Sequence, residues 1–335
     1  MKVKILITSL LVTALLSITA CSKNPVTGRK DFSLISEQQE LSMGAQAHRS
    51  ILKKKKRLNN PRLQSYVNNI GQQLARQSHR KGLKYTFTVL DDPSVNAFAL
   101  PGGFIYITTG LMAYLNSEAE LAGVIGHEIG HVTARHGVKQ QSAGMASAIL
   151  VSVLAKKGGA GSGKQYNQLG RALLSGYGRD HELQADRLGA EYLARIGYQP
   201  QNMIKVVSVL KAQEEFEKYQ ARQEGRKPRV YHGVFSSHPS NDRRLQQVIN
   251  EAKKYQTSGI KDEGHDRYLR QINGIKYRIS KNKYGRVVVG TATTPGLTYA
   301  KLARRSKVGE QRLRLLNGMF PKGQPVRGRL IKVIN

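Results

Sequence analysis

Apolar residues recur along the chain at two spacings, which predict a mixture of helices and short strands. Apolar residues three or four apart predict helices at 37–56, 61–77, 117–137 and 178–198. Two stretches rich in β-branched and aromatic residues, 83–92 and 102–110, are bounded by turn formers and predict strands. The pattern therefore predicts an α+β fold that is mainly helical and contains a small β-sheet.

The pattern changes beyond Lys254. Residues 255–272 are polar and rich in turn formers, which predicts a linker, and 275–290 predicts a β-hairpin. A small α+β domain is therefore expected at 273–335. Its two helical stretches and closing strand resemble a LysM repeat, although the first strand of such a repeat is hard to place. The resemblance implies peptidoglycan binding, and the alternative is a structural or protein-docking module.

The segment Ala143–Ala155 is apolar on all sides and is followed by charged residues and glycines. Thirteen residues are too few to cross a membrane as a helix. A buried helix is the simpler interpretation. The alternative is a lid or a membrane-contacting element hinged at Gly158–Gly163.

The amino terminus predicts export. Two lysines precede an apolar run, 5–17, that is too short to span a bilayer, and small residues follow, as in a signal peptide at 1–20. The alternative is an uncleaved anchor or a chance run of small residues. The tetrapeptide Ile18–Cys21 resembles a bacterial lipobox, which implies cleavage before Cys21 and a lipidated segment at 21–36. Ser22, rather than an aspartate, follows the cysteine, and this favours the outer membrane. Because Cys21 is the only cysteine, no internal disulfide is expected.

Size and charge narrow the class of protein. The 335 residues are 39% hydrophobic, which is enough for a substantial core. The 54 Lys and Arg residues exceed the 22 Asp and Glu residues, so the formal net charge is +32. Such a chain attracts anionic partners, including lipid headgroups, envelope polymers and nucleic acid. Nucleic acid is not expected, because the chain carries an export signal and lacks a basic motif interleaved with aromatic residues.

A candidate metal site lies in Leu121–Gly137, which contains the pattern H-E-x-x-H. Ser117 and Glu120 fit a capping box at the start of this helix, and Gly137 predicts its end. On a helix, His127 and His131 stand one above the other, so their imidazoles can converge on a zinc ion. Glu128 then reaches the metal site without being a ligand, in the position of a general base. The alternative is a set of polar residues scattered on a helix.

A third ligand is needed, and two candidates exist. His136 follows His131 by five residues, but the intervening sequence lacks the glycine bend of the metzincin pattern, so we expect His136 beside the site rather than on the metal. Glu182 and Asp186 lie four apart on one face of a second predicted helix. Glu182 would complete the set His127, His131 and Glu182 around one Zn²⁺ per chain, and Asp186 would orient a ligand histidine. The alternative is an ordinary acidic helix face.

Several motifs in order resemble one family of enzymes. They are NPVTGRKDFSLISEQQELSMG after the lipobox, NAFALPGG, GHEIGHVTARH and RDHELQADRLGA. Together they resemble the periplasmic BepA/LoiP-type relatives of the HtpX and CAAX prenyl protease (Ste24-type) family of zinc peptidases, across Asn24–Glu251. The resemblance implies a gluzincin-like metalloprotease domain, placed at 37–254. It also implies that His127, His131 and Glu182 bind zinc and that Glu128 is the catalytic base.

The resemblance extends to SSHPSNDRRL at 236–245, which is similar to the His-Pro segment near the metal in such enzymes. It implies that His238 stabilises the transition state or occupies the fourth zinc position. The alternative is a helix-entry histidine before Pro239.

Substrate binding is expected near the second predicted strand. The Pro-Gly-Gly turn at 101–103 favours an edge strand or a sharply bent entry to the strand, where free backbone groups would pair with an extended peptide. The expected substrate-binding residues are Asn96, Gly103, Phe104, Ile105 and Tyr106.

These observations predict a zinc-dependent endopeptidase of the bacterial cell envelope. Its expected substrates are misfolded or unassembled envelope and outer-membrane proteins. It is expected in the periplasm, anchored through Cys21 to the outer membrane, with contacts to anionic lipid or peptidoglycan. Two alternatives remain, a metal-containing chaperone or assembly factor with little proteolysis and a peptidoglycan-associated binding lipoprotein.

Overall fold

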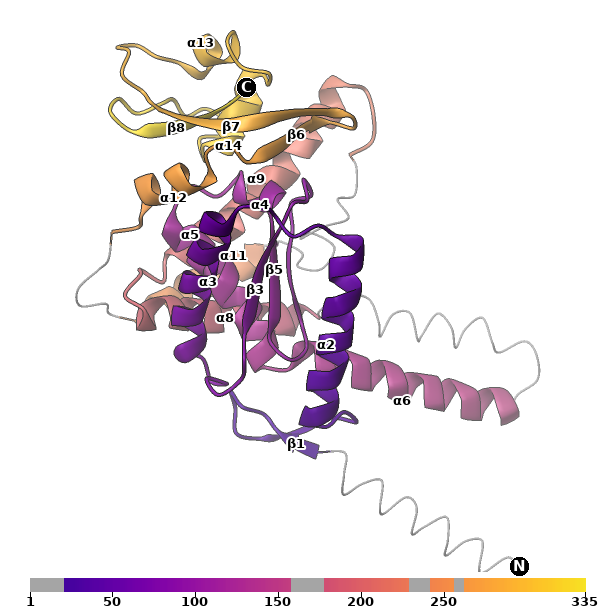
Figure 1. Cartoon of the computed structure of the whole chain (residues 1–335). Coiled ribbons are helices and arrows are strands. Elements are labelled where there is room, and N and C mark those ends of the chain that lie inside the picture. The colour runs from indigo at the N-terminus through magenta and orange to yellow at the C-terminus, as the bar shows by residue number, and fades with distance from the viewer. Residues whose placement is uncertain (1–20, 158–177, 229–241, 256–261) are drawn as a thin grey trace, which may run out of the picture.

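A computed structural model describes residues 21–157, 178–228, 242–255 and 262–335 (Figure 1). The larger part of the molecule is a three-stranded sheet surrounded by helices, and the smaller carboxyl-terminal part is a second sheet with its own short helices. The predicted α+β fold of the larger part is confirmed.

The predicted helices of the larger part begin at the residues that cap them. Helix α2 (Glu37–Lys54) begins with a capping box, in which Ser36 Oγ accepts from Gln39 N and Gln39 Oε1 accepts from Ser36 N. Helix α3 (Pro61–Arg76) begins after Asn60, whose side chain accepts from Leu63 N. The remaining long helices are α5 (Glu118–Thr133), α6 (His136–Lys157), α8 (Arg179–Arg195), α9 (Asn202–Gln223) and α11 (Asp242–Ala252).

The sheet of the larger part differs from expectation at its edge. Its strands β3 (Thr86–Leu90), β4 (Ala97–Leu100) and β5 (Phe104–Thr108) lie in the order β3-β5-β4. Strand β5 is parallel to β3 and antiparallel to β4, so it is the central strand and the expected edge position is wrong. The reason is local. Residues Asn96–Gly103 form a hairpin arm that folds back on β5 and takes the edge position. The other alternative, a sharply bent entry, agrees with the turn at 101–103, where Gly102 and Gly103 have positive φ.

The apolar segment Ala143–Ala155 lies in α6, which points away from the rest of the molecule (Figure 1). None of Ala143–Ala148 is buried, and Met145 is 47% exposed, so the buried helix expected here is wrong for these residues. The hinge expected at Gly158–Gly163 lies outside the described residues. Within the described ranges, no helix has the length and apolar character needed to cross a bilayer.

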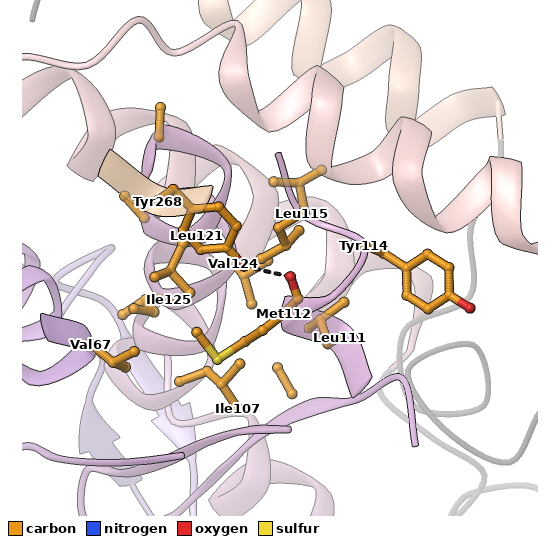
Figure 2. Close-up of a cluster of buried hydrophobic side chains, with 14 of the residues drawn as sticks. Val67, Ile107, Leu111, Met112, Tyr114, Leu115, Leu121, Val124, Ile125 and Tyr268 are labelled. Carbon is orange, nitrogen blue, oxygen red and sulfur yellow. Dashed lines mark hydrogen bonds between the residues drawn. The ribbon is translucent and has the colours of Figure 1, made fainter. Parts of the chain in front are cut away.

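The core continues from the sheet through α5 into the carboxyl-terminal part. Figure 2 shows Val67 of α3, Ile107 of β5 and Leu121 and Ile125 of α5 around Met112, which belongs to the short helix α4 (Thr109–Met112). Tyr268 of α12 (His265–Ile272) is fully buried in the same cluster, and its hydroxyl donates to the Met112 carbonyl over 2.6 Å. Helix α12 falls within the stretch 255–272 that was predicted as a linker.

The carboxyl-terminal sheet has the strand order β6-β7-β8. Its elements are β6 (Lys276–Ser280), β7 (Lys283–Thr291), α13 (Tyr299–Ala303), α14 (Glu310–Leu316) and β8 (Leu330–Ile334). Strand β7 precedes the two helices and pairs antiparallel with β8, which closes the unit. A separate two-stranded pair, β1 (Cys21–Lys23) and β2 (Lys30–Phe32), precedes α2.

Lys332 of β8 joins the two parts of the molecule. Its side chain is fully buried, and Nζ donates to the carbonyls of Ala113 and Leu115 at 2.8 and 2.7 Å. These carbonyls lie in the segment that leads into α5. The carboxyl-terminal part therefore holds the start of α5 in place.

The pH dependence of stability tests this contact. Burial lowers the pKa of Lys332 from 10.5 to about 7. Between these values the unfolded chain binds a proton that the folded chain does not, so the unfolding free energy rises with pH. Above pH 7 we expect the unfolding free energy of wild type to rise relative to that of Lys332→Met, by up to about 1.4 kcal/mol per pH unit.

Urea unfolding at several pH values between 7 and 9.5 measures this difference. Lys322→Met is the control, because Lys322 is an exposed lysine of the same part of the chain, and it should leave the pH profile parallel to that of wild type. A parallel profile for Lys332→Met as well would contradict the expectation.

Candidate metal centre

Helix α5 carries the H-E-x-x-H pattern and is shorter than predicted. Ser117 Oγ accepts from Glu120 N, as the predicted capping box requires. The Glu120 side chain accepts from Asn116 N, one residue before the Ser117 N of a standard capping box. The helix ends at Thr133 rather than near Gly137, because Arg135 adopts a left-handed conformation with φ of 56°. His136 therefore begins α6 instead of continuing α5.

Close packing brings α8 against the metal-site face of α5. A Cβ atom at Gly130 would lie 3.0 Å from the Ala185 carbonyl oxygen, and one at Gly126 would lie 3.3 Å from Gly189 Cα. Gly126 directly precedes His127 and Gly130 directly precedes His131, and both allow the helix backbones to approach. This approach puts Glu182 within reach of the two histidines.

Three buried side chains converge on one point. His127 Nε2 and His131 Nε2 lie 3.0 Å apart, and Glu182 Oε1 and Oε2 lie 3.3 Å from His131 Nε2 and 3.5 Å from His127 Nε2. Ligand atoms around a tetrahedral zinc ion, at about 2.0–2.1 Å from the metal, are about 3.3 Å from one another. Among the described residues, these three are the group of His, Cys, Asp and Glu side chains close enough to hold a metal ion.

The electrostatics of this point favour a cation. Burial alone lowers the pKa of His127, but the hydrogen bonds and charges of Asp186 and Glu182 outweigh burial and raise it to about 10. The two carboxylates therefore stabilise positive charge at the imidazole. Two imidazoles and one carboxylate are also a donor set that zinc accepts with one position left for water or substrate.

Asp186 and Arg244 contact His127 and Glu182 and help to hold these two side chains in place. Asp186 Oδ1 lies 2.9 Å from His127 Nδ1, which fixes the tautomer that leaves Nε2 unprotonated for a metal. Arg244 of α11 donates to both Asp186 oxygens at 2.7 Å, and its Nη1 lies 3.1 Å from Glu182 Oε2. Although Asp186 is fully buried, the Arg244 guanidinium keeps its pKa below the usual value.

Arg244 was missed in the sequence analysis. It lies in the segment quoted for His238, but it is one of two adjacent arginines in a very basic chain, and no local pattern marks it as buried. In the structure it is 2% exposed.

His136 contacts the imidazole of His131 on the side away from Glu182. His131 Nδ1 lies 2.9 Å from His136 Nδ1, and His136 Nε2 lies 3.0 Å from Gln184 Oε1. Burial, followed by the charge of His181, lowers the pKa of His136 to about 3, so its imidazole stays neutral. A neutral His136 that donates to Gln184 accepts the Nδ1 proton of His131, and this leaves His131 Nε2 for the metal.

Glu128 adjoins a small cavity of about 30 Å³. Its wall includes Val124, His127, Glu128 and Arg244, together with Ala97 from the edge strand β4. His238, the other expected catalytic residue, lies outside the described residues.

Comparison with known proteins identifies the family. The family model of Peptidase family M48 matches residues 61–252, which is more than half of the chain. The chain belongs to peptidase family M48. The expected zinc-peptidase family resemblance and the metalloendopeptidase class are thereby confirmed.

The relatives of this M48 chain include proteases with two different names. A putative beta-barrel assembly-enhancing protease of Vibrio cholerae is 31% identical over 187 residues, 52% of this chain and 38% of the relative. The beta-barrel assembly-enhancing protease of Escherichia coli K12 is 29% identical over 274 residues, 77% of this chain and 53% of the relative. The mitochondrial metalloendopeptidase OMA1 of Saccharomyces cerevisiae is 28% identical over 249 residues, 69% of this chain and 68% of the relative. The chain thus spans about half or less of the length of the first two relatives.

The residues expected to bind substrate in this M48 chain lie in and beside the paired strands. Ile105 and Tyr106 are fully buried in β5, and the Tyr106 hydroxyl lies 2.5 Å from His48 Nδ1. The backbone of Asn96 pairs with Thr108. Phe104 stacks on His48, and a Cβ atom at Gly103 would lie 2.8 Å from the Lys84 carbonyl oxygen. Because β3 and β4 occupy both sides of β5, a peptide has no free backbone on β5 with which to pair.

Proposed function

We propose that this chain is a zinc-dependent endopeptidase of the bacterial cell envelope. The observation that carries the proposal is the convergence of His127, His131 and Glu182 on one point, with Glu128 next to His127 on the same helix. When bound, zinc supplies Lewis-acid polarisation of the scissile carbonyl and acidification of water.

Glu128 acts as the general base and then as the general acid. It lies on the same helix as the two proposed ligand histidines and lines the small cavity beside His127. It takes a proton from the attacking water and passes it to the leaving amine. Asp186, held by Arg244, keeps His127 oriented throughout.

The substrate is an extended polypeptide that pairs with strand β4. This strand is the edge of the sheet next to α5, and its first residue, Ala97, lines the cavity beside Glu128. Pairing with the backbone of Ala97–Leu100 places a peptide bond near the metal centre without requiring a particular side chain. Binding of this kind selects unfolded segments, because a folded protein does not offer a free strand.

Misfolded or unassembled outer-membrane proteins are the substrate class we propose. Two of the relatives are named as beta-barrel assembly-enhancing proteases. The predicted signal peptide and the lipidation of Cys21 would place the enzyme in the periplasm, attached to the outer membrane. The domain boundary near 255 and the LysM-like unit remain part of this proposal. The order β7-α13-α14-β8 supports that unit, with peptidoglycan as its candidate ligand.

Metal removal tests the proposal directly. Purified mature protein should contain one zinc ion per chain and should degrade unfolded casein, and a chelator should stop the reaction. Adding back zinc should restore it. Degradation that a chelator leaves unchanged, or protein that binds no metal after exposure to zinc, would contradict a zinc peptidase.

A further inference from the structure

We propose that Glu40 of α2 is a positioning residue that holds the edge strand β4 at a fixed distance from the zinc-binding helix α5. The inference rests on the proposed peptidase function and deepens it. Glu40 lies outside the three proposed metal ligands and the proposed base.

The buried carboxylate of Glu40 contacts both the end of α5 and the turn between β4 and β5. Glu40 is 1% exposed, and its Oε2 accepts from Arg135 Nε at 2.8 Å, directly after the end of α5. Its Oε1 accepts from Arg80 Nη1 at 2.6 Å, and the same nitrogen lies 3.3 Å from the Val132 carbonyl of α5. Oε1 also lies 3.4 Å from Gly102 N in the turn between β4 and β5. Glu40 therefore contacts the strand side and the helix side at once.

The face of α2 that carries Glu40 is fitted to the β4–β5 hairpin. One turn after Glu40, a Cβ atom at Gly44 would lie 1.9 Å from the Pro101 carbonyl oxygen, so the helix and the turn meet backbone to backbone. One turn later, the ring of His48 stacks on Phe104 with centroids 4.6 Å apart. The hairpin has little freedom to move relative to α2, because three successive turns of the helix contact it.

The helix side of this contact is strained. Among the non-glycine residues that the structure describes, Arg135 has the positive φ, 56°. An L-residue adopts this conformation only when its surroundings hold it there. The Arg135 side chain is held by Glu40 and by the Ile35 carbonyl at 3.1 Å. The strained residue lies four positions after the proposed ligand His131.

These contacts place β4 relative to the metal ligands. A small cleft lined by Glu40, Ala99, Leu100, His131 and Arg135 lies between the end of β4 and the end of α5. A peptide that pairs with β4 takes its position from that strand, whereas the metal and Glu128 take theirs from α5. Misplacement of a substrate by about 1 Å can lower the rate about 100-fold. Loss of Glu40 therefore lowers turnover more than it lowers binding.

Glu40→Gln tests the inference, with Glu37→Gln as a matched control. Glu37 lies one turn earlier on α2 and accepts from Arg80 Nη2 at 2.9 Å, but its side chain is 71% exposed and does not contact Arg135. For an extended peptide substrate we expect Glu40→Gln to lower kcat by about 10–100-fold, with KM within about threefold of wild type. Zinc content should be unchanged, and Glu37→Gln should have wild-type kinetics.

Two inhibitors separate positioning from general damage to the site. Acetohydroxamate contacts only the metal and its immediate neighbours, so its inhibition constant should be the same for wild type and Glu40→Gln. A peptidyl hydroxamate long enough to pair with β4 should bind Glu40→Gln more weakly. Unchanged kcat in Glu40→Gln, or equal weakening of both inhibitors, would overturn the inference.

A second variant and a second measurement keep the inference testable. If Glu40→Gln does not fold, Gly44→Ala displaces the same turn without changing a charge, and it should show the same loss of kcat. Hydrogen exchange measures the contact without activity. Amides in 97–103 and 132–138 should exchange faster together in Glu40→Gln and remain protected in Glu37→Gln. Failure of wild type to bind zinc or cleave peptide would reject the proposed function, and exchange that is unchanged in Glu40→Gln would reject the positioning role.

Discussion

Replacing Glu128 by glutamine is expected to lower kcat for hydrolysis of an unfolded protein by about 10²–10⁴-fold while the zinc content stays that of wild type. Glutamine keeps the size and most contacts of the buried side chain but cannot take a proton from water. The proposed ligands His127, His131 and Glu182 are untouched, so metal binding should persist. Chelator-sensitive casein cleavage and metal analysis of the same preparation measure the two quantities.

Glu120→Gln is a control on the same helix. Glu120 is buried two turns before Glu128, and its carboxylate accepts from the backbone of Asn116 rather than facing the cavity. Its replacement should leave kcat near that of wild type. If Glu128→Gln keeps full activity, Glu128 is not the base.

The same Glu128→Gln variant separates the proposed peptidase from an assembly factor. A peptidase that removes misfolded outer-membrane proteins should lose its effect in cells when Glu128 is replaced. Rescue of outer-membrane defects by the inactive variant would instead favour a chaperone or assembly role.

Replacing Arg244 by methionine is expected to lower the unfolding free energy by about 3–5 kcal/mol, because removal of one partner leaves buried charges without compensation. Arg244 is 2% exposed and contacts both Asp186 and Glu182. Asp186 would then lose the partner that keeps it charged, and its hold on His127 would weaken. The zinc affinity should fall about 10–100-fold, as for other groups that orient metal ligands.

Urea unfolding and zinc competition with a chromogenic chelator measure these two effects. Arg187→Met is the control, because Arg187 is an exposed arginine next to Asp186 on α8 and should change stability by less than about 0.5 kcal/mol. A variant Arg244→Met with wild-type zinc affinity would show that Asp186 orients His127 without help from the arginine.

Patterns among residues close together in the chain were sufficient to predict the helices and the convergence of His127 and His131. Ser117 caps α5 as its spacing to Glu120 predicted, because capping depends on residues three apart in the chain, and Ser36 and Asn60 cap α2 and α3 by the same rule. His127 and His131 face one point for the same kind of reason, since residues four apart on a helix are neighbours wherever the helix lies. Glu182 and Asp186 share a face of α8 by the same rule.

The errors arose where the outcome depends on pairing and contacts between separate segments of the chain. Strand β5 became central because the short arm Ala97–Leu100 folds back on it, and a sequence pattern does not show which strand takes the edge. The end of α5 was placed too late because Arg135, which is not a glycine, adopts the left-handed conformation that stops the helix. Contacts with Glu40 and the Ile35 carbonyl, about one hundred residues away in the chain, stabilise it there.

The sequence by itself determined the type of chemistry. Helical periodicity alone places His127 beside His131 on one helix and Glu182 beside Asp186 on another. Only the tertiary structure decided that Glu182 meets the two histidines, that Arg244 neutralises the carboxylates behind them, and that β4 adjoins the site. The physical reason is range. Periodicity acts within one turn of a helix, whereas these contacts depend on how closely separate elements pack, and glycines such as Gly130 and Gly44 set that distance.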